Sequence, residues 1–483
     1  MDPTTNPALQ LVDSHISSAN ATSGGHANGG YEYQQLDQKH AVEHSSGANE
    51  KQQATQRLEP LELEQQQPPA PPTDADDFPG DRGALPASIV LLGAFLTLFP
   101  SFGFMVSIGT LQDYWQYHQL ADYSSRDIGW IPSVFVYLAL SLGICVGPLF
   151  DMYGPRWLLG VGSVAYVIMT FLLAECSEYW QFLLCLGFLG GPAGAALTTT
   201  SMACVSHWFR VRRGLAAGLA MVGSSFGGVV IPLVLRATLP KYGYAWSMRI
   251  LGFVFLVCLA LGNVLMKARL PPSPDAKKQR IFSLALFGDP AFCFLTASVF
   301  GIEIVLFGAL GILPTYASMG TDYPPETGFY LIAVMNGVSC LGRIIPGFVS
   351  DVVGRFNVFG TMMVVTLVIM LVIWLPFGHT SLAALYIFVA IFGFGTGSWM
   401  AMTPACLGQL CGAEHFGRYY GTCYFIASLS TLICIPISGE LVQRVGPQPM
   451  VGFMCAVLAA SIGTFTVSRW ACLGWRWKWM AKI

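Results

Sequence analysis

The chain has 483 residues, of which 54% are hydrophobic and only 11% are charged. Soluble domains carry about 25% charged residues, so this composition cannot cover a water-exposed surface and predicts a protein of the lipid bilayer. The formal net charge is only -2, and the chain shows no basic footprint for nucleic acid.

Residues 1–85 precede the first apolar segment. They are rich in Gln, Ser, Asn, Gly and Pro and contain no apolar window long enough for the core of a helix. We therefore predict a disordered cytoplasmic N-terminal tail. The tail has no basic stretch followed by an apolar one, so it is not a signal peptide, and the first membrane helix is expected to act as the targeting signal.

The rest of the chain contains twelve apolar segments of about 20 residues, the length that crosses a bilayer as a helix. Six fall within 86–266 and six within 291–470. We predict an all-α membrane protein with twelve transmembrane helices in two pseudo-symmetric six-helix bundles. A basic, proline-containing linker at 267–290 joins the bundles on the cytoplasmic side, and 471–483 form a cytoplasmic C-terminal tail.

The loops predict the orientation. Lys and Arg gather in the loops on the side of the two termini, whereas the opposite loops hold few cations, chiefly Arg126, Lys241 and Arg444. By the positive-inside rule both termini are cytoplasmic. We take the plasma membrane as the default location of this multi-pass protein, without a sorting signal to support it.

A glycine–aspartate–glycine motif occurs twice, each time after the second apolar segment of a half. Its two copies are Gly147, Asp151, Gly154 with Arg156, and Gly347, Asp351, Gly354 with Arg355. Matched spacing at matched positions indicates a duplicated six-helix unit. Glycine lets helix ends approach closely, and aspartate can cap a neighbouring helix or pair with an arginine. We interpret the motif as a conformational latch; an ordinary solvated turn is the alternative.

Two charged residues fall inside apolar segments, where an ionised side chain is costly and usually faces a cavity. At 1.5 Å per residue, Glu303 and Arg343 lie about 18 Å and about 9 Å from the cytoplasmic ends of their helices. Either a mutual pair or a shared substrate fits this difference in depth. Asn336 and Ser339 share the helical face of Arg343, and we predict that this face lines the substrate pathway. The alternatives are a snorkelling Arg343 and a structural hydrogen bond for Glu303.

Three stretches carry a family resemblance. They are the duplicated motif, His207-Trp-Phe-Arg-Val-Arg-Arg213 followed by Gly-Leu-Ala, and Leu341-Gly-Arg343-Ile-Ile-Pro346-Gly347. With them the chain resembles the major facilitator superfamily over about residues 81–470, and in particular the fungal branch of the monocarboxylate transporter family. The resemblance implies that Arg343 binds a substrate carboxylate.

The chain lacks two charged residues that proton-coupled animal members of that family carry. Proton-coupled animal members carry an aspartate one turn before the arginine and a lysine in the first helix; here the turn position is Ser339, and residues 84–110 hold no charge. Proton coupling is therefore left open, with Glu303 as a candidate replacement protonation site. Weaker, uncharged candidates for the substrate pathway are Phe102, Phe104 and Met105 in the first segment, and Tyr420 and Tyr424 in the eleventh.

We predict a secondary active transporter that moves a small, monocarboxylate-like organic anion or a related metabolite by alternating access. The alternatives are an efflux carrier for a fungal secondary metabolite and a non-transporting membrane sensor that signals through its tail. There is no nucleotide-binding loop and no recognisable nucleophile, base or metal constellation, so we predict neither an enzyme nor a bound cofactor or metal.

Overall fold

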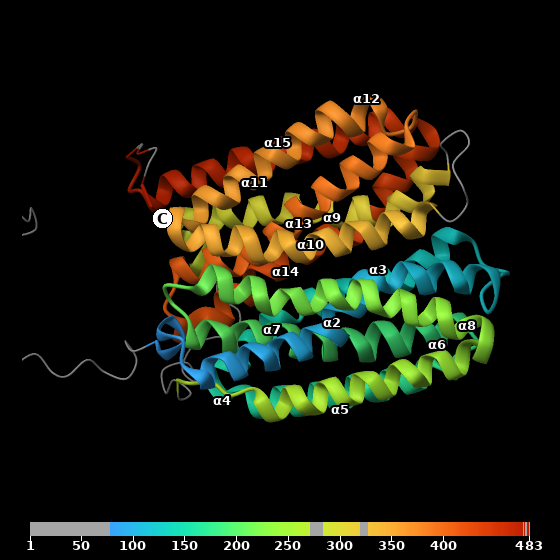
Figure 1. The fold of residues 1–483 in the computed structure, drawn as a ribbon, viewed down its shortest axis with the longest axis horizontal. Helices are drawn as coiled ribbons and strands as arrows, with labels where there is room; N and C mark the ends of the chain where they lie inside the picture. The colour runs from blue at the N-terminus through green and yellow to red at the C-terminus, as the bar shows by residue number, and fades with distance from the viewer. Residues whose placement is uncertain (1–77, 271–283, 319–326, 477, 479–480, 483) are drawn as a thin grey trace, which may run out of the picture. The chain divides into compact units, whose positions relative to one another are not determined.

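A computed structural model describes residues 78–270, 284–318, 327–476, 478 and 481–482, which belong to one compact unit. Within these residues every regular element is a helix (Figure 1). Most of the predicted N-terminal tail and residues 271–283 of the predicted linker lie outside the described residues.

The first bundle is built from residues up to 265. After a short 3₁₀-helix, η2 (Pro79–Arg82), its helices are α2 (Leu85–Tyr117), α3 (Ser125–Ser141) continued by α4 (Gly143–Tyr153), α5 (Pro155–Leu173), the continuous run α6 (Tyr179–Phe182), η3 (Leu183–Gly190) and α7 (Gly191–Trp208), and α8 (Arg213–Leu265). The long α8 is two membrane passes, because Gly243 inside it has a φ of 72° that no helix continues through.

The second bundle repeats this order. After η5 (Leu284–Gly288), its helices are α9 (Pro290–Ser318), α10 (Thr327–Val353), the continuous run α11 (Arg355–Ile369), η6 (Met370–Trp374) and α12 (Leu375–Phe377), then α13 (Leu382–Leu410), η7 (Ala413–His415), α14 (Phe416–Arg444) and α15 (Pro447–Cys472). The two halves therefore share one pattern of passes.

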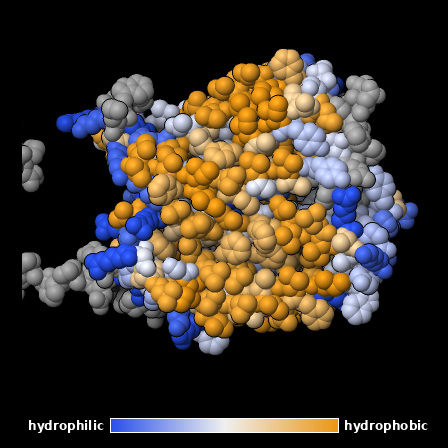
Figure 2. Space-filling view, viewed as in Figure 1, coloured by the Kyte–Doolittle hydropathy of each residue, from blue (hydrophilic) through white to orange (hydrophobic). Residues whose placement is uncertain are grey.

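The predicted all-helical membrane fold is confirmed. Ten helices of the described residues are long and apolar enough to cross a bilayer. Since α8 is divided at Gly243 into two passes and α14 adds one more, the passes match the twelve predicted segments. Figure 2 shows a broad apolar belt between two polar ends, as expected when lipid covers the flanks.

The beginning of α2 and the end of α15 lie on the same side of the bundle, at the left of Figure 1. We call this side, which also carries Arg156, Arg212 and Arg355, the terminal face, and the other side the opposite face. An even number of passes requires this arrangement of the two ends.

The start of the fold corrects one predicted boundary. Residues 78–85, included in the predicted tail, are part of the folded unit because Asp81 anchors them. Its carboxylate accepts hydrogen bonds from the backbone N–H groups of Arg210, Val211 and Arg212, at 3.1, 2.8 and 2.9 Å. A single acidic side chain thus ties the entry of α2 to the loop before α8.

Candidate functional site

At the terminal face the two bundles touch through their backbones. A side chain on Gly147 of α4 would overlap the carbonyl oxygen of Gly417 in α14, and one on Gly347 of α10 would come within 2.8 Å of the Gly214 carbonyl oxygen in α8. Only glycine permits such an approach. The terminal face is therefore closed, with α4 against α14 and α10 against α8.

The two motif aspartates lie at these contacts, and each caps a helix of the other bundle. Asp351 accepts hydrogen bonds from the N–H groups of Gly214 and Leu215, both at 2.9 Å, in the first turn of α8. Asp151 accepts one from the N–H of Arg418 at 3.1 Å, in the first turn of α14. A helix N-terminus has unpaired N–H groups and a partial positive charge, so a carboxylate stabilises it.

In the rest of the motif the glycines of the two copies behave alike, whereas the arginines differ. Gly154 and Gly354 both have positive φ angles, 77° and 112°, which end one helix and start the next. Arg355 is buried, lies 3.6 Å from Asp351 and donates a hydrogen bond to the carbonyl oxygen of Val211 at 3.0 Å. Arg156 is exposed. The arginine of the second copy thus joins the contact between the bundles.

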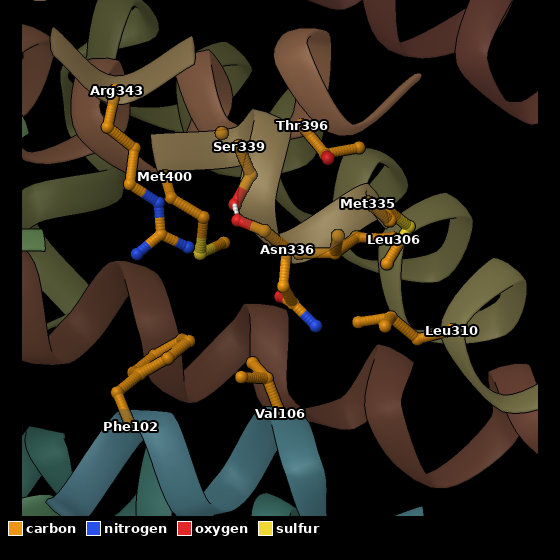
Figure 3. Close-up of a pocket in the computed structure, with 11 residues that line it drawn as sticks. Phe102, Val106, Leu306, Leu310, Met335, Asn336, Ser339, Arg343, Thr396 and Met400 are labelled. Carbon is orange, nitrogen blue, oxygen red and sulfur yellow. Dashed lines mark hydrogen bonds between the residues drawn. The ribbon is translucent and has the colours of Figure 1, made fainter. Parts of the chain in front are cut away.

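A cavity lies between the bundles farther from the terminal face. Figure 3 shows Phe102 and Val106 of α2 across from Arg343, Asn336 and other residues of the second bundle. Together with the open space at its mouth, the cavity measures about 320 Å³. The lining comes from α2, α9, α10 and α13 and consists of Phe102, Val106, Leu306, Leu310, Met335, Asn336, Ser339, Arg343, Thr396, Gly397 and Met400.

Four of the predicted site residues meet in this cavity: Phe102, Asn336, Ser339 and Arg343. The last three lie on one face of α10, as their spacing predicts. Ser339 also reaches the other bundle, because its hydroxyl oxygen lies 2.5 Å from that of Ser225 in α8. The polar part of the cavity is therefore built mainly by α10.

Arg343 is only 3% exposed and bridges the bundles. Its Nη1 donates hydrogen bonds to the carbonyl oxygen of Met221 and to the hydroxyl of Ser224, both in α8, whereas its Nε has no hydrogen-bond partner. Among the ion pairs of the described residues, none includes Arg343. A buried guanidinium without an anionic partner is unusual, since burying a charge is costly unless it is paired.

Glu303 and Tyr420 lie away from this cavity. Glu303 is fully buried and neither carboxylate oxygen has a hydrogen-bond partner. It interacts electrostatically with Tyr420 and Tyr424 of α14. The structure thus does not form the Glu303–Arg343 pair considered from the sequence, because Arg343 turns toward α8 and Glu303 toward α14.

Several lining residues were not among the predicted ones. They are Thr396, Gly397 and Met400 of α13. Ser224 and Ser225 of α8 do not line the cavity, but their hydroxyl groups contact Arg343 and Ser339. None of these residues is charged, so the sequence gives no sign that they lie near Arg343. Their position follows only from the arrangement of the helices.

The fold and a central cavity between two halves are those of a membrane carrier. The sequence model of the Major Facilitator Superfamily matches residues 90–433, and the chain belongs to that superfamily.

Relatives and solved structures agree with this family. The chain is 34% identical to the MFS transporter asaE of Aspergillus flavus, over 78% of this chain and 84% of that protein. It is 33% identical to the riboflavin transporter MCH5 of Saccharomyces cerevisiae (84% and 81%) and 34% identical to the aspyridones efflux protein apdF of Emericella nidulans (78% and 76%). The crystal structure of the human organic anion transporter MFSD10 shares the fold, with a TM-score of 0.64, 15% identity and coverage of 78% and 98%.

Proposed function

We propose that the protein is a secondary active transporter that moves a small organic anion by alternating access, with Arg343 as the group that binds the anion. The observation that carries the proposal is a buried guanidinium that lines the cavity between the bundles and has no carboxylate partner among the described residues. An anionic substrate would supply the missing charge. This role for Arg343 also agrees with the resemblance to monocarboxylate transporters.

Residues outside the cavity have two proposed roles. The closed terminal face, with Asp151 and Asp351 capping helices across the bundles, is the latch that opens when the cavity turns to that face. Glu303 is a site for a coupling proton. Glu303 lies on the helix face of Leu306 and Leu310, which line the cavity, so a movement of α9 against α14 would bring its carboxyl group into the cavity.

A second candidate function differs from the first in the direction of transport and in the substrate. Two relatives are named as efflux proteins, for aspyridones and for fujikurins, which supports export of a fungal secondary metabolite. On the positive-inside rule we place the termini in the cytoplasm of a plasma-membrane protein. A sensor that binds ligand without transport is the remaining alternative, and proteoliposome flux separates it from both transporters.

The test is untargeted metabolite profiling of cells and medium, with and without the protein. We expect wild type to redistribute an organic anion, Arg343→Gln to match cells lacking the protein, and Arg343→Lys to be impaired because a lysine cannot bind a carboxylate in bidentate fashion. The control is Arg444→Gln, which removes an exposed arginine that pairs with Glu440 on the opposite face. Redistribution that persists in Arg343→Gln would contradict the proposal.

A further inference from the structure

A second cavity adjoins the one that contains Arg343. The two share Val106 of α2 and Leu310 of α9 in their linings, so they lie side by side. Together with the open space at its mouth, the second compartment measures about 630 Å³, about twice the 320 Å³ of the first. We call the compartment with Arg343 the inner compartment and the larger one the outer compartment.

The outer compartment lies toward the opposite face and is shared by both bundles. Its lining is Met105, Val106, Ser107, Ile108, Gly109, Thr110, Gln112, Pro132, Ser133, Val136, Phe307, Leu310, Gly311, Ile332 and Thr431. Along α2 the two compartments extend from Phe102 to Gln112, which is about 15 Å at 1.5 Å per residue. The space is therefore long compared with a short carboxylic acid.

The outer compartment contains no charged side chain, and its hydroxyl groups are largely committed to their own helices. Ser107 donates to the carbonyl oxygen of Gly103 at 2.8 Å, Ser133 to that of Gly129 at 2.9 Å, and Thr431 to that of Ser428 at 2.7 Å. A hydroxyl that already donates to its backbone offers a ligand little more than acceptor capacity. Apart from the Thr110 hydroxyl and the Gln112 amide, the compartment therefore favours an apolar guest.

We infer that the ligand is an amphipathic organic anion, whose carboxylate binds Arg343 in the inner compartment while an apolar body of ring size fills the outer compartment. This inference rests on the proposed function and specifies its substrate class. A short hydrophilic monocarboxylate would bind Arg343 but would make no contact with the apolar lining of the outer compartment. Each buried methylene contributes about a fourfold gain in affinity, so the outer compartment selects for the larger molecule.

The test measures binding to the purified full-length protein in nanodiscs of zwitterionic lipid, by the shift of its melting temperature. The probes are acetate, phenylacetate, 1-naphthylacetate and the neutral 1-naphthylacetamide. We expect apparent affinity to rise at least about tenfold from acetate to phenylacetate, to rise again for 1-naphthylacetate, and to be lost for the amide because it lacks the charge. Arg343→Gln should lose binding of all three anions.

One substitution addresses the outer compartment alone. A side chain at Gly109 would meet no atom within 4 Å, and this residue lines the outer compartment. Gly109→Trp therefore meets no clash at its Cβ and places a large side chain at the outer compartment, and it should abolish the advantage of 1-naphthylacetate over acetate while acetate still binds. The control is Gly463→Trp in α15, an exposed glycine that also has no atom within 4 Å and lines neither compartment.

The outcomes separate the two proposals. If 1-naphthylacetate binds no better than acetate, or keeps its advantage in Gly109→Trp, the amphipathic ligand is ruled out while the anion transporter stands. If the amide binds as well as the acid, the anionic head is wrong. If no anion binds, or Arg343→Gln binds them like wild type, the proposed function fails and this inference fails with it.

Discussion

The contact between Asp351 and α8 makes a quantitative prediction about the closed terminal face. Asp351 accepts two hydrogen bonds from N–H groups, at Gly214 and Leu215, and its side chain is only 9% exposed. Asp351→Asn removes the charge and at least one acceptor. A hydrogen bond to a charged group contributes about 1.5–3 kcal/mol, so the open-to-closed ratio should rise roughly 10- to 150-fold.

Double electron–electron resonance can measure this shift. Spin labels on ketone-bearing unnatural residues at Trp157 of α5 and Val352 of α10 would report the separation of the bundles, because both side chains are exposed and lie at the terminal face. The control is Glu175→Gln, which breaks an exposed ion pair with Arg249 inside the first bundle. If Asp351→Asn changes the open-to-closed ratio, taken from the distance distribution, by less than threefold, the capping contact does not hold the face closed.

Two further predictions concern the same movement. Gly147→Leu should also favour the open terminal face, because its side chain would overlap the Gly417 carbonyl oxygen. The same distance measurement checks this. An unchanged distance distribution would show that α4 and α14 can separate locally without opening the face. Glu303→Gln should remove the pH dependence of transport of the metabolite found by profiling, since an amide cannot carry the proton; flux in proteoliposomes with and without a pH gradient tests this, and a pH dependence equal to wild type would exclude Glu303 as the coupling site.

The sequence was most informative where a pattern repeats. The matched Gly–Asp–Gly copies predicted two equivalent halves, and both aspartates do lie at equivalent contacts between the bundles. The spacing of Asn336, Ser339 and Arg343 likewise predicted one polar face, because helical periodicity fixes which residues of one helix lie together. The first prediction follows from a repeat and the second from helical periodicity, and both patterns are visible in the order of residues.

Contacts between helices could not be predicted in this way. The depths of Glu303 and Arg343 fit a pair, but depth does not fix the direction in which a helix face points, and the two side chains approach different neighbours. The end of the tail was misplaced for a similar reason. Asp81 looks like a loop residue in the sequence, and only the fold brings the N–H groups of the loop before α8 to its carboxylate.

Arg343 connects the proposed ligand site to the closure of the terminal face. In the closed arrangement its Nη1 bonds to the Met221 carbonyl oxygen and the Ser224 hydroxyl across the boundary between the bundles. A carboxylate that binds through Nη1 and Nη2 competes with these bonds and replaces neutral acceptors by a charged one, whereas a carboxylate that binds through Nε and Nη2 leaves them in place. A ligand can shift a conformational equilibrium only through its different affinity for the two states. On the proposed function, an anion that binds Nη1 therefore favours opening, because it takes over the group that otherwise bonds α10 to α8.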